Sequence, residues 1–388
     1  MSEYTDHDIT GASIGMVEKQ FFTFAENDPG FLLDSGASLS PVTLAYEACG
    51  TLNSQKDNVI LVLHALTGDS HVAGYYQAQD PKPGWWDIMV GPGKGIDTDH
   101  YFVVCSNIIG SCMGSTGPAS INPETTQAYG MDFPMITMGD MVRAQKALMD
   151  HLGLDRVLCV VGGSVGGMQA LEWCVRYPDM VGSAVILAST TRHSALAIAF
   201  NEVARQSIMA DPNWNQGHYY TGAKPDMGLA IARMIGHITY LSDESMRMKF
   251  GRKLQNKSAL SFEFGAEFQV ESYLQYQGNK FIERFDANSF LYITKAADYF
   301  DLAKDHGNGS LAKAFSAMKS RFLVVSYTSD WLYPTYQSKE MVKAMKKNDL
   351  DVSFCEIDAQ WGHDAFLLPN PRLSDMIRGF LRSARYES

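Results

Sequence analysis

A glycine-flanked serine between an apolar run and a helical stretch is the feature that most constrains the fold of this chain. Residues 157–161 are apolar and mostly β-branched, as in a buried strand, and Gly162-Gly163-Ser164-Val165-Gly166-Gly167 follows at once. A helical stretch then runs over 168–177. On so sharp a strand-to-helix turn a serine is strained, and the glycines let strand and helix approach closely. The pattern predicts a nucleophilic Ser164 above the carboxyl end of a sheet; the alternative is a glycine-rich loop that binds phosphate.

Further apolar runs predict the rest of an α/β fold. Strands are expected at 42–46, 58–63, 101–105, 185–187, 321–327 and 352–357, and helices at 138–152 and 374–382. Because several strands are apolar throughout and alternate with helices, we expect a mostly parallel sheet with helices on both faces. Residues 191–318 differ, since mixed Met, Tyr and charged residues at helical spacing dominate there. We therefore expect a core formed by residues 1–190 and 319–388, with an inserted helical lid over 191–318.

Composition narrows the range of partners. The 388 residues include 43 acidic and 32 basic ones, a net charge of −11, which argues against nucleic acid and anionic membranes as partners. The amino terminus lacks the basic start and apolar run of a signal peptide, and no apolar stretch approaches the roughly 18 residues of a membrane span. None of the six cysteines forms a C-x-x-C pair. We expect a cytoplasmic protein with reduced cysteines and without a metal.

A nucleophilic serine needs a histidine as general base, and the histidine needs an acid to hold its tautomer. Five histidines follow the serine in the chain: His193, His218, His237, His306 and His363. Only His363 lies in a short loop after an expected core strand, which favours it as the base. In folds of this kind the chain order is serine, acid, histidine, each just beyond a strand end.

Asp330 is the expected acid because it follows the strand 321–327 by three residues. Its rivals, Asp358 and Asp364, sit on the same loop as His363 and would have to fold back on a near neighbour. The alternative role for Asp330 is a helix N-cap.

Two backbone N–H groups are needed to stabilise an oxyanion. One is expected from Val165, directly after the serine, and the second from the loop 64–68 after an earlier strand, where Leu66 is our choice. His64 precedes the serine turn, so we expect it to have a structural role.

Six stretches of the chain carry a longer pattern: 63–74 (LHALTGDSHVAG), 84–87 (GWWD), 91–99 (GPGKGIDTD), 114–118 (GSTGP), 162–173 (GGSVGGMQALEW) and 362–366 (GHDAF). From about residue 15 onward, the chain resembles the homoserine O-acetyltransferase family of the α/β-hydrolase superfamily. The resemblance implies an α/β-hydrolase fold and acetyl transfer from acetyl-CoA to the hydroxyl of L-homoserine, an early step of methionine synthesis. It also implies a ping-pong route through an acetyl-serine and a homodimer.

Three further residues take roles from the resemblance. Arg233 matches the family's arginine for the amino-acid carboxylate, which a guanidinium binds bidentately, and Asp364 matches the acid that contacts the amino-acid substrate. From the residues alone, Arg233 would be an exposed helix arginine. Relatives that use succinyl-CoA typically carry an arginine where this chain has Leu332, and a leucine leaves a succinyl carboxylate without a partner. Acetyl is therefore the expected acyl group.

Several alternatives stay open. A serine O-acyltransferase of the same family stays possible, because serine is one methylene shorter than homoserine and one methylene discriminates by only about 1–3 kcal/mol. A homoserine O-succinyltransferase of the same family is a further alternative. A serine esterase would need only that water reaches the acyl-enzyme. A non-catalytic interaction protein of the same fold is the third class, and the complete set of Ser164, Asp330 and His363 argues against it.

Overall fold

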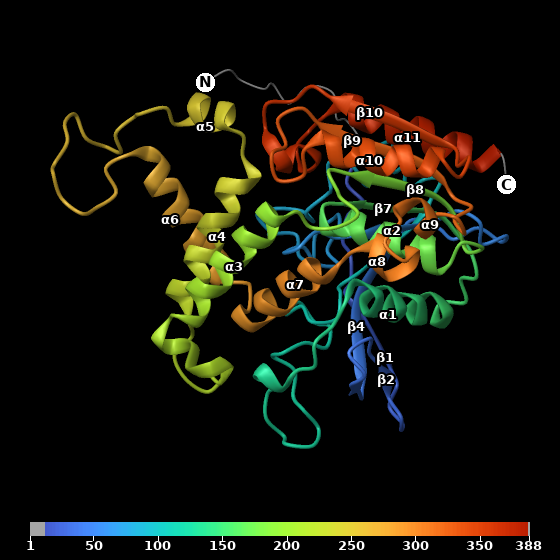
Figure 1. Ribbon diagram of the computed structural model, residues 1–388, viewed down its shortest axis with the longest axis horizontal. Helices are drawn as coiled ribbons and strands as arrows, with labels where there is room; N and C mark the ends of the chain where they lie inside the picture. Colours follow the sequence, from blue (N-terminus) through green and yellow to red (C-terminus); the bar gives the residue numbers. More distant parts are fainter. Residues whose placement is uncertain (1–11, 387–388) are drawn as a thin grey trace.

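The computed structural model describes residues 12–386 and contains an eight-stranded sheet at its centre (Figure 1). The strand order is β1-β4-β6-β5-β7-β8-β9-β10. β1 pairs antiparallel with β4 and β4 pairs antiparallel with β6, whereas all other neighbours are parallel. The strands are β1 (Gln20–Phe24), β4 (Val42–Cys49), β5 (Val59–Leu63), β6 (Phe102–Ser106), β7 (Val157–Gly163), β8 (Val181–Leu187), β9 (Arg321–Tyr327) and β10 (Val352–Ile357). A small hairpin, β2 (Phe31–Leu32) and β3 (Ser38–Leu39), stands apart from this sheet.

Continuous apolar strands arise because both faces of the sheet are covered. In β5, Val59, Leu61 and Leu63 pack into one core, while Ile60 and Val62 pack into the core on the other face. The first core includes side chains of α1 (Met138–His151), α2 (Val165–Arg176) and α10 (Thr335–Lys346). The second core includes side chains of α11 (Pro371–Tyr386). The expected mostly parallel sheet with helices on both faces is confirmed.

A helical segment connects β8 to β9, where the sequence lacks a strand pattern. Figure 1 shows α3, α4 and α6 as a layer to one side of the sheet, with α7 leading back toward the core. The helices of this segment are α3 (Ala195–Met209), α4 (Asp226–Tyr240), α5 (Asp243–Lys249), α6 (Gln269–Ile282), α7 (Ala287–Tyr299), α8 (Leu302–Gly307) and α9 (Leu311–Ala314). The predicted helical character of this region is confirmed.

The element boundaries differ from the predictions where polar or exposed residues interrupt the pattern. β8 begins at Val181, four residues before the expected start, because Gly182 and Ser183 interrupt the apolar pattern at the beginning of the strand. The Ser183 hydroxyl donates to the Leu158 carbonyl. β1 was not expected at all, since it is an edge strand in which Phe21 is exposed. The helix after Ser164 starts at Val165 and not at residue 168.

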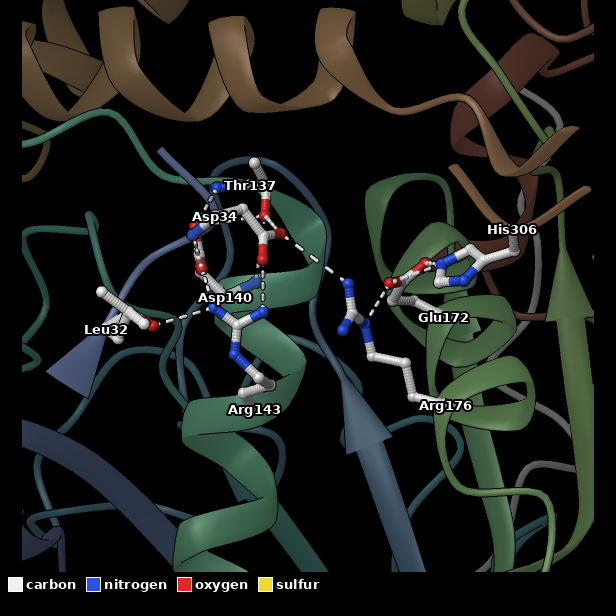
Figure 2. Close-up of polar contacts among 8 residues, drawn as sticks. All are labelled: Leu32, Asp34, Thr137, Asp140, Arg143, Glu172, Arg176 and His306. Carbon is white, nitrogen blue, oxygen red and sulfur yellow. Dashed lines mark hydrogen bonds and ion pairs between the residues drawn. The ribbon is translucent and has the colours of Figure 1, made fainter. Parts of the chain in front are cut away.

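A charge network ties the helix that follows the serine to the rest of the core (Figure 2). Asp34, in the β2–β3 hairpin, pairs with Arg143 of α1 at 2.5 Å and with Arg176 of α2 at 3.7 Å. Arg176 also donates to Glu172, one turn earlier, and His306 of α8 lies 3.0 Å from the same carboxylate. Burial alone would raise the pKa of Glu172, but His306 and Arg176 outweigh it and hold that pKa below its usual value.

Replacing Glu172 with glutamine is expected to reduce the free energy of unfolding at pH 7 by about 1–3 kcal/mol, because the charge-assisted hydrogen bonds of this buried carboxylate with the partly exposed Arg176 and with His306 are lost. A carboxyl whose pKa is lowered in the folded state stabilises the protein above its unfolded value, 4.5, and this contribution disappears as pH falls through the folded pKa. The stability of Glu172→Gln should therefore fall less steeply below about pH 4.5, as measured by urea unfolding. Glu283→Gln, at an exposed pair with Lys280, is the control. An equal loss in both variants would contradict the prediction.

Candidate active site

The turn after β7 holds Ser164 in a strained conformation. Its backbone has φ 57° and ψ −123°, a region that non-glycine residues rarely occupy. A Cβ on Gly166 would collide with the Leu63 carbonyl oxygen, and one on Gly162 with the Gly166 carbonyl. The glycines are therefore required for the close approach of β7, β5 and α2. The turn is also fixed by hydrogen bonds, as the Ser164 N–H donates to Leu187 and its carbonyl accepts from the Ser189 hydroxyl.

Ser164, His363 and Asp330 are joined by hydrogen bonds in that order. His363 Nε2 lies 2.8 Å from Ser164 Oγ, and His363 Nδ1 lies 2.8 Å from Asp330 Oδ2. All three side chains are buried. Burial would lower the pKa of His363, but the charge and hydrogen bond of Asp330 outweigh it and hold that pKa above its usual value. This arrangement is able to take a proton from the serine and hold it on the histidine.

The second oxygen of Asp330 accepts backbone hydrogen bonds, as the alternative role of an N-cap predicts. Asp330 Oδ1 accepts hydrogen bonds from the backbone N–H groups of Leu332 and Tyr333, at 3.0 and 2.9 Å. The carboxylate thus caps the turn after β9 while its other oxygen faces His363. The rival Asp358 instead accepts from the Thr328 hydroxyl at 2.9 Å.

The two expected oxyanion donors both border the cavity in front of the serine. Val165 is the first residue of α2, where a backbone N–H has no partner within the helix, and Leu66 lies in the loop after β5. His64, at the start of that loop, is buried; its Nε2 accepts from the Ile108 N–H at 3.2 Å, and its carbonyl accepts from Gln169. These bonds hold His64 against the core at the start of the loop.

Arg233 of α4 and Asp364 carry opposite charges close to His363. The Arg233 guanidinium stacks on Phe281, 4.8 Å from the ring centroid, and donates weakly to Thr67 Oγ1 at 3.4 Å. It is half-buried, not the exposed helix arginine that the local pattern indicates. Burial raises the pKa of the Asp364 carboxyl, and the charges of His363 and Arg233 only partly offset this.

A second histidine–aspartate pair reaches the site from the helical segment, and sequence reasoning missed it. His193 Nδ1 lies 3.0 Å from Asp298 of α7, and its Nε2 lies 2.7 Å from the Tyr333 hydroxyl. The Tyr333 ring packs edge-on against the His363 ring with centroids 5.0 Å apart. The sequence does not indicate His193, because among the histidines after Ser164 only His363 lies in a short loop after an expected core strand. The partner of His193 is 105 positions away, so no local signal identifies it.

The cavity beside Ser164 lies between the ends of the strands and helices α3, α4 and α7. Residues from both parts of the chain line it, among them Leu66, Val165, Leu332 and Tyr333 from the core and His193, Phe200, Ile235 and Tyr240 from the helical segment. Within residues 12–386, no cluster of His, Cys, Asp or Glu has the arrangement needed to hold a metal ion. In the same part of the chain no helix combines the length and apolarity that crossing a membrane requires.

The strand order and the strained serine after β7 are those of an α/β hydrolase. In agreement, the family model of the alpha/beta hydrolase fold matches residues 58–369. Homoserine O-acetyltransferase from Solidesulfovibrio magneticus is 68% identical over 99% of this chain and 97% of its own. The enzyme of the same name from Desulfotalea psychrophila is 60% identical over 98% and 97%. The chain belongs to the homoserine O-acetyltransferase family, which confirms the resemblance found in the sequence.

Two solved structures share the fold of this chain, but their names give different activities. The crystal structure of homoserine O-acetyltransferase from Bacillus anthracis matches with a TM-score of 0.88 and 31% identity, covering 94% of this chain and 98% of that one. Esterase E22 matches with a TM-score of 0.84 and 32% identity, covering 94% and 100%. At this level of identity the fold therefore does not distinguish acyl transfer to an alcohol from hydrolysis.

Proposed function

We propose that this chain transfers an acetyl group from acetyl-CoA to the hydroxyl of L-homoserine, as a step of methionine biosynthesis, by a ping-pong mechanism through acetyl-Ser164. The observation that carries the proposal is the bonded series Ser164–His363–Asp330, with the Asp364 carboxyl close enough to His363 and Arg233 for their charges to act on it. Two relatives named homoserine O-acetyltransferase, 68% and 60% identical over nearly the whole chain, support the proposal.

In the first half-reaction His363 takes the proton of Ser164 while Oγ attacks the thioester carbonyl carbon of acetyl-CoA. The N–H groups of Leu66 and Val165 stabilise the negative oxygen of the tetrahedral intermediate. When the intermediate collapses, the carbon–sulfur bond breaks and the thiolate takes the proton from His363. The products of this half-reaction are free CoA and acetyl-Ser164.

In the second half-reaction the homoserine hydroxyl gives its proton to His363 and attacks the acetyl carbonyl carbon. The bond to Ser164 Oγ then breaks, and Oγ recovers the proton from His363. Arg233 binds the carboxylate of the amino acid bidentately and Asp364 contacts its ammonium group, which places the hydroxyl next to His363.

Replacing Arg233 with lysine is expected to raise the KM for homoserine about 10–50-fold, because an ammonium cannot bind a carboxylate bidentately. The KM for acetyl-CoA should change less than about twofold. Steady-state kinetics with each substrate varied in turn measures both values. Arg247→Lys, at an exposed position of α5, is the control. Equal changes in both KM values would show that Arg233 does not bind the substrate carboxylate.

Leu332 is proposed to set the acyl group, since its side chain borders the cavity beside Ser164. Replacing Leu332 with arginine is expected to raise the ratio of kcat/KM for succinyl-CoA to that for acetyl-CoA about tenfold, because one charge-assisted hydrogen bond is worth about 1.5–3 kcal/mol. Leu332→Met keeps the size without the charge and should leave the ratio unchanged. An unchanged ratio in the arginine variant would refute this role.

The proposed function is tested by combining acetyl-CoA or succinyl-CoA with homoserine, serine or water and measuring the CoA released. We expect rapid release with acetyl-CoA and homoserine together and slow release with either alternative donor or acceptor. Consumption of acetyl-CoA near zero with every alcohol, beside rapid hydrolysis of p-nitrophenyl acetate, would instead identify an esterase.

We also propose that residues 191–318 form a lid over the site, that the protein is a homodimer, and that it works in the cytoplasm. Exposed apolar side chains on α4 and α5 favour the helical segment as the interface: Met227, Ile231, Ile238 and Met248. The six free cysteines fit a reducing compartment. A monomeric mass by light scattering would refute the dimer.

A further inference from the structure

The loop between residues 64 and 71 carries groups that serve both halves of the site. Leu66, the proposed oxyanion donor, borders the cavity. The next residue, Thr67, accepts a hydrogen bond from Arg233 through its hydroxyl and one from Arg284 through its carbonyl, at 3.4 and 3.0 Å. Any displacement of this loop would therefore move the oxyanion donor and loosen the support of Arg233 at the same time.

One end of the loop is held by neutral groups of the core. His64 is bonded to the Ile108 N–H and to the Gln169 amide, at 3.2 and 3.1 Å. The Gly68 N–H closes a turn on the Ala65 carbonyl at 2.9 Å. These contacts fix where the loop leaves β5, but they do not reach its second half.

The other end is held in part by a buried carboxylate, Glu47, on strand β4, which β6 separates from β5. Glu47 is 3% exposed, and its Oε2 lies 3.0 Å from Nδ1 of His71. Its Oε1 accepts from the Tyr76 hydroxyl at 2.5 Å and from the Ser70 hydroxyl at 3.4 Å. The His71 and Tyr76 rings stack with centroids 4.0 Å apart. Three side chains from the end of the loop and just beyond it thus converge on one carboxylate.

We propose that Glu47 is a positioning residue for the reaction: by gathering Ser70, His71 and Tyr76 it holds the loop so that Leu66 faces the oxyanion and Thr67 supports Arg233. Glu47 touches no reacting atom. The chemical reason is that three donors, the buried Ser70 and the partly buried His71 and Tyr76, lose their acceptor when the carboxylate is removed. A loop with unpaired polar groups shifts to find new partners. This inference rests on the proposed function for its substrates.

The test compares Glu47→Met, which removes every acceptor at similar size, with Glu47→Gln, which keeps one oxygen. Because both tetrahedral intermediates use the same oxyanion donors, we expect kcat to fall about 100-fold in the methionine variant, the lower end of the range for loss of one donor. In the glutamine variant, which keeps one oxygen, we expect a smaller fall of about tenfold. The burst rate with p-nitrophenyl acetate and the rate of phosphonylation by a fluorophosphonate should fall by the same factors. The KM for homoserine should rise several-fold, whereas that for acetyl-CoA should not.

Glu172→Gln is the matched control, since Glu172 is an equally buried carboxylate, in α2, and this variant should lose stability with kcat unchanged. If Glu47→Met does not fold, Tyr76→Phe removes a single donor and should lower both rates about two- to fivefold. Unchanged rates per folded molecule in the glutamine and phenylalanine variants would overturn the proposal. The fluorophosphonate and p-nitrophenyl assays use neither CoA nor homoserine. A wild-type protein that reacts with them but forms no acetylhomoserine would refute the proposed function and leave the role of Glu47 measurable.

Discussion

Replacing Ser164 with alanine is expected to lower the rate of acetyl transfer by about 10⁴–10⁶-fold, because no other group in the cavity is placed to form the acyl intermediate. His363 would keep its bond to Asp330 but would have no hydroxyl to deprotonate. The fold should persist, since alanine retains the Cβ that already tolerates φ 57° and the backbone hydrogen bonds of the turn remain. Release of CoA from acetyl-CoA with homoserine measures the loss.

Ser183→Ala is the matched control for this variant. Ser183 is an equally buried serine on the adjacent strand β8, where its hydroxyl donates to the Leu158 carbonyl, away from the cavity. It should retain its activity with a modest loss of stability, whereas Ser164→Ala should show the reverse. Activity within tenfold of wild type in Ser164→Ala would show that the acyl group is not carried by this serine.

The sheet could be predicted because its central strands are apolar on both faces. β9 begins and ends where its apolar run does, and β5 differs by one residue from the expected run. β10, at one edge of the sheet, also has the predicted bounds. β1 could not be predicted in this way, because an edge strand with one solvated face carries no continuous apolar run. Of the two edge strands, the sequence thus predicts β10 but not β1.

The placement of Ser164, Asp330 and His363 followed from topology more than from residue identity. Ser164 comes directly after its strand, and Asp330 and His363 lie in the loops that follow β9 and β10. β7, β8, β9 and β10 are parallel neighbours whose carboxyl ends meet at one edge of the sheet. Chain order then excluded the other residues. The structure brings the three side chains together as this order requires.

The residues that support this arrangement could not be predicted, because their partners are distant in sequence. His193 meets Asp298 and Tyr333 only after the helical segment folds over the core. Glu47 lies in a strand whose alternation gives no hint that one side chain is a buried carboxylate with three donors. Such contacts depend on tertiary packing and leave no periodic signal in a single chain.

Replacing Asp330 with asparagine is expected to lower kcat about 10⁴-fold, the size of effect that such a change has in serine triads generally, with little loss of structure. The two backbone N–H groups on Oδ1 require the amide oxygen to occupy that position, so the new NH₂ group must face His363 Nδ1. His363 would then carry its proton on Nε2, pointing at Ser164, and could not accept the serine proton. Asp358→Asn, on the loop that leads to His363, should stay within twofold of wild type in the same CoA-release assay. Comparable losses in both variants would show that a general change in this region, and not the tautomer of His363, accounts for the effect.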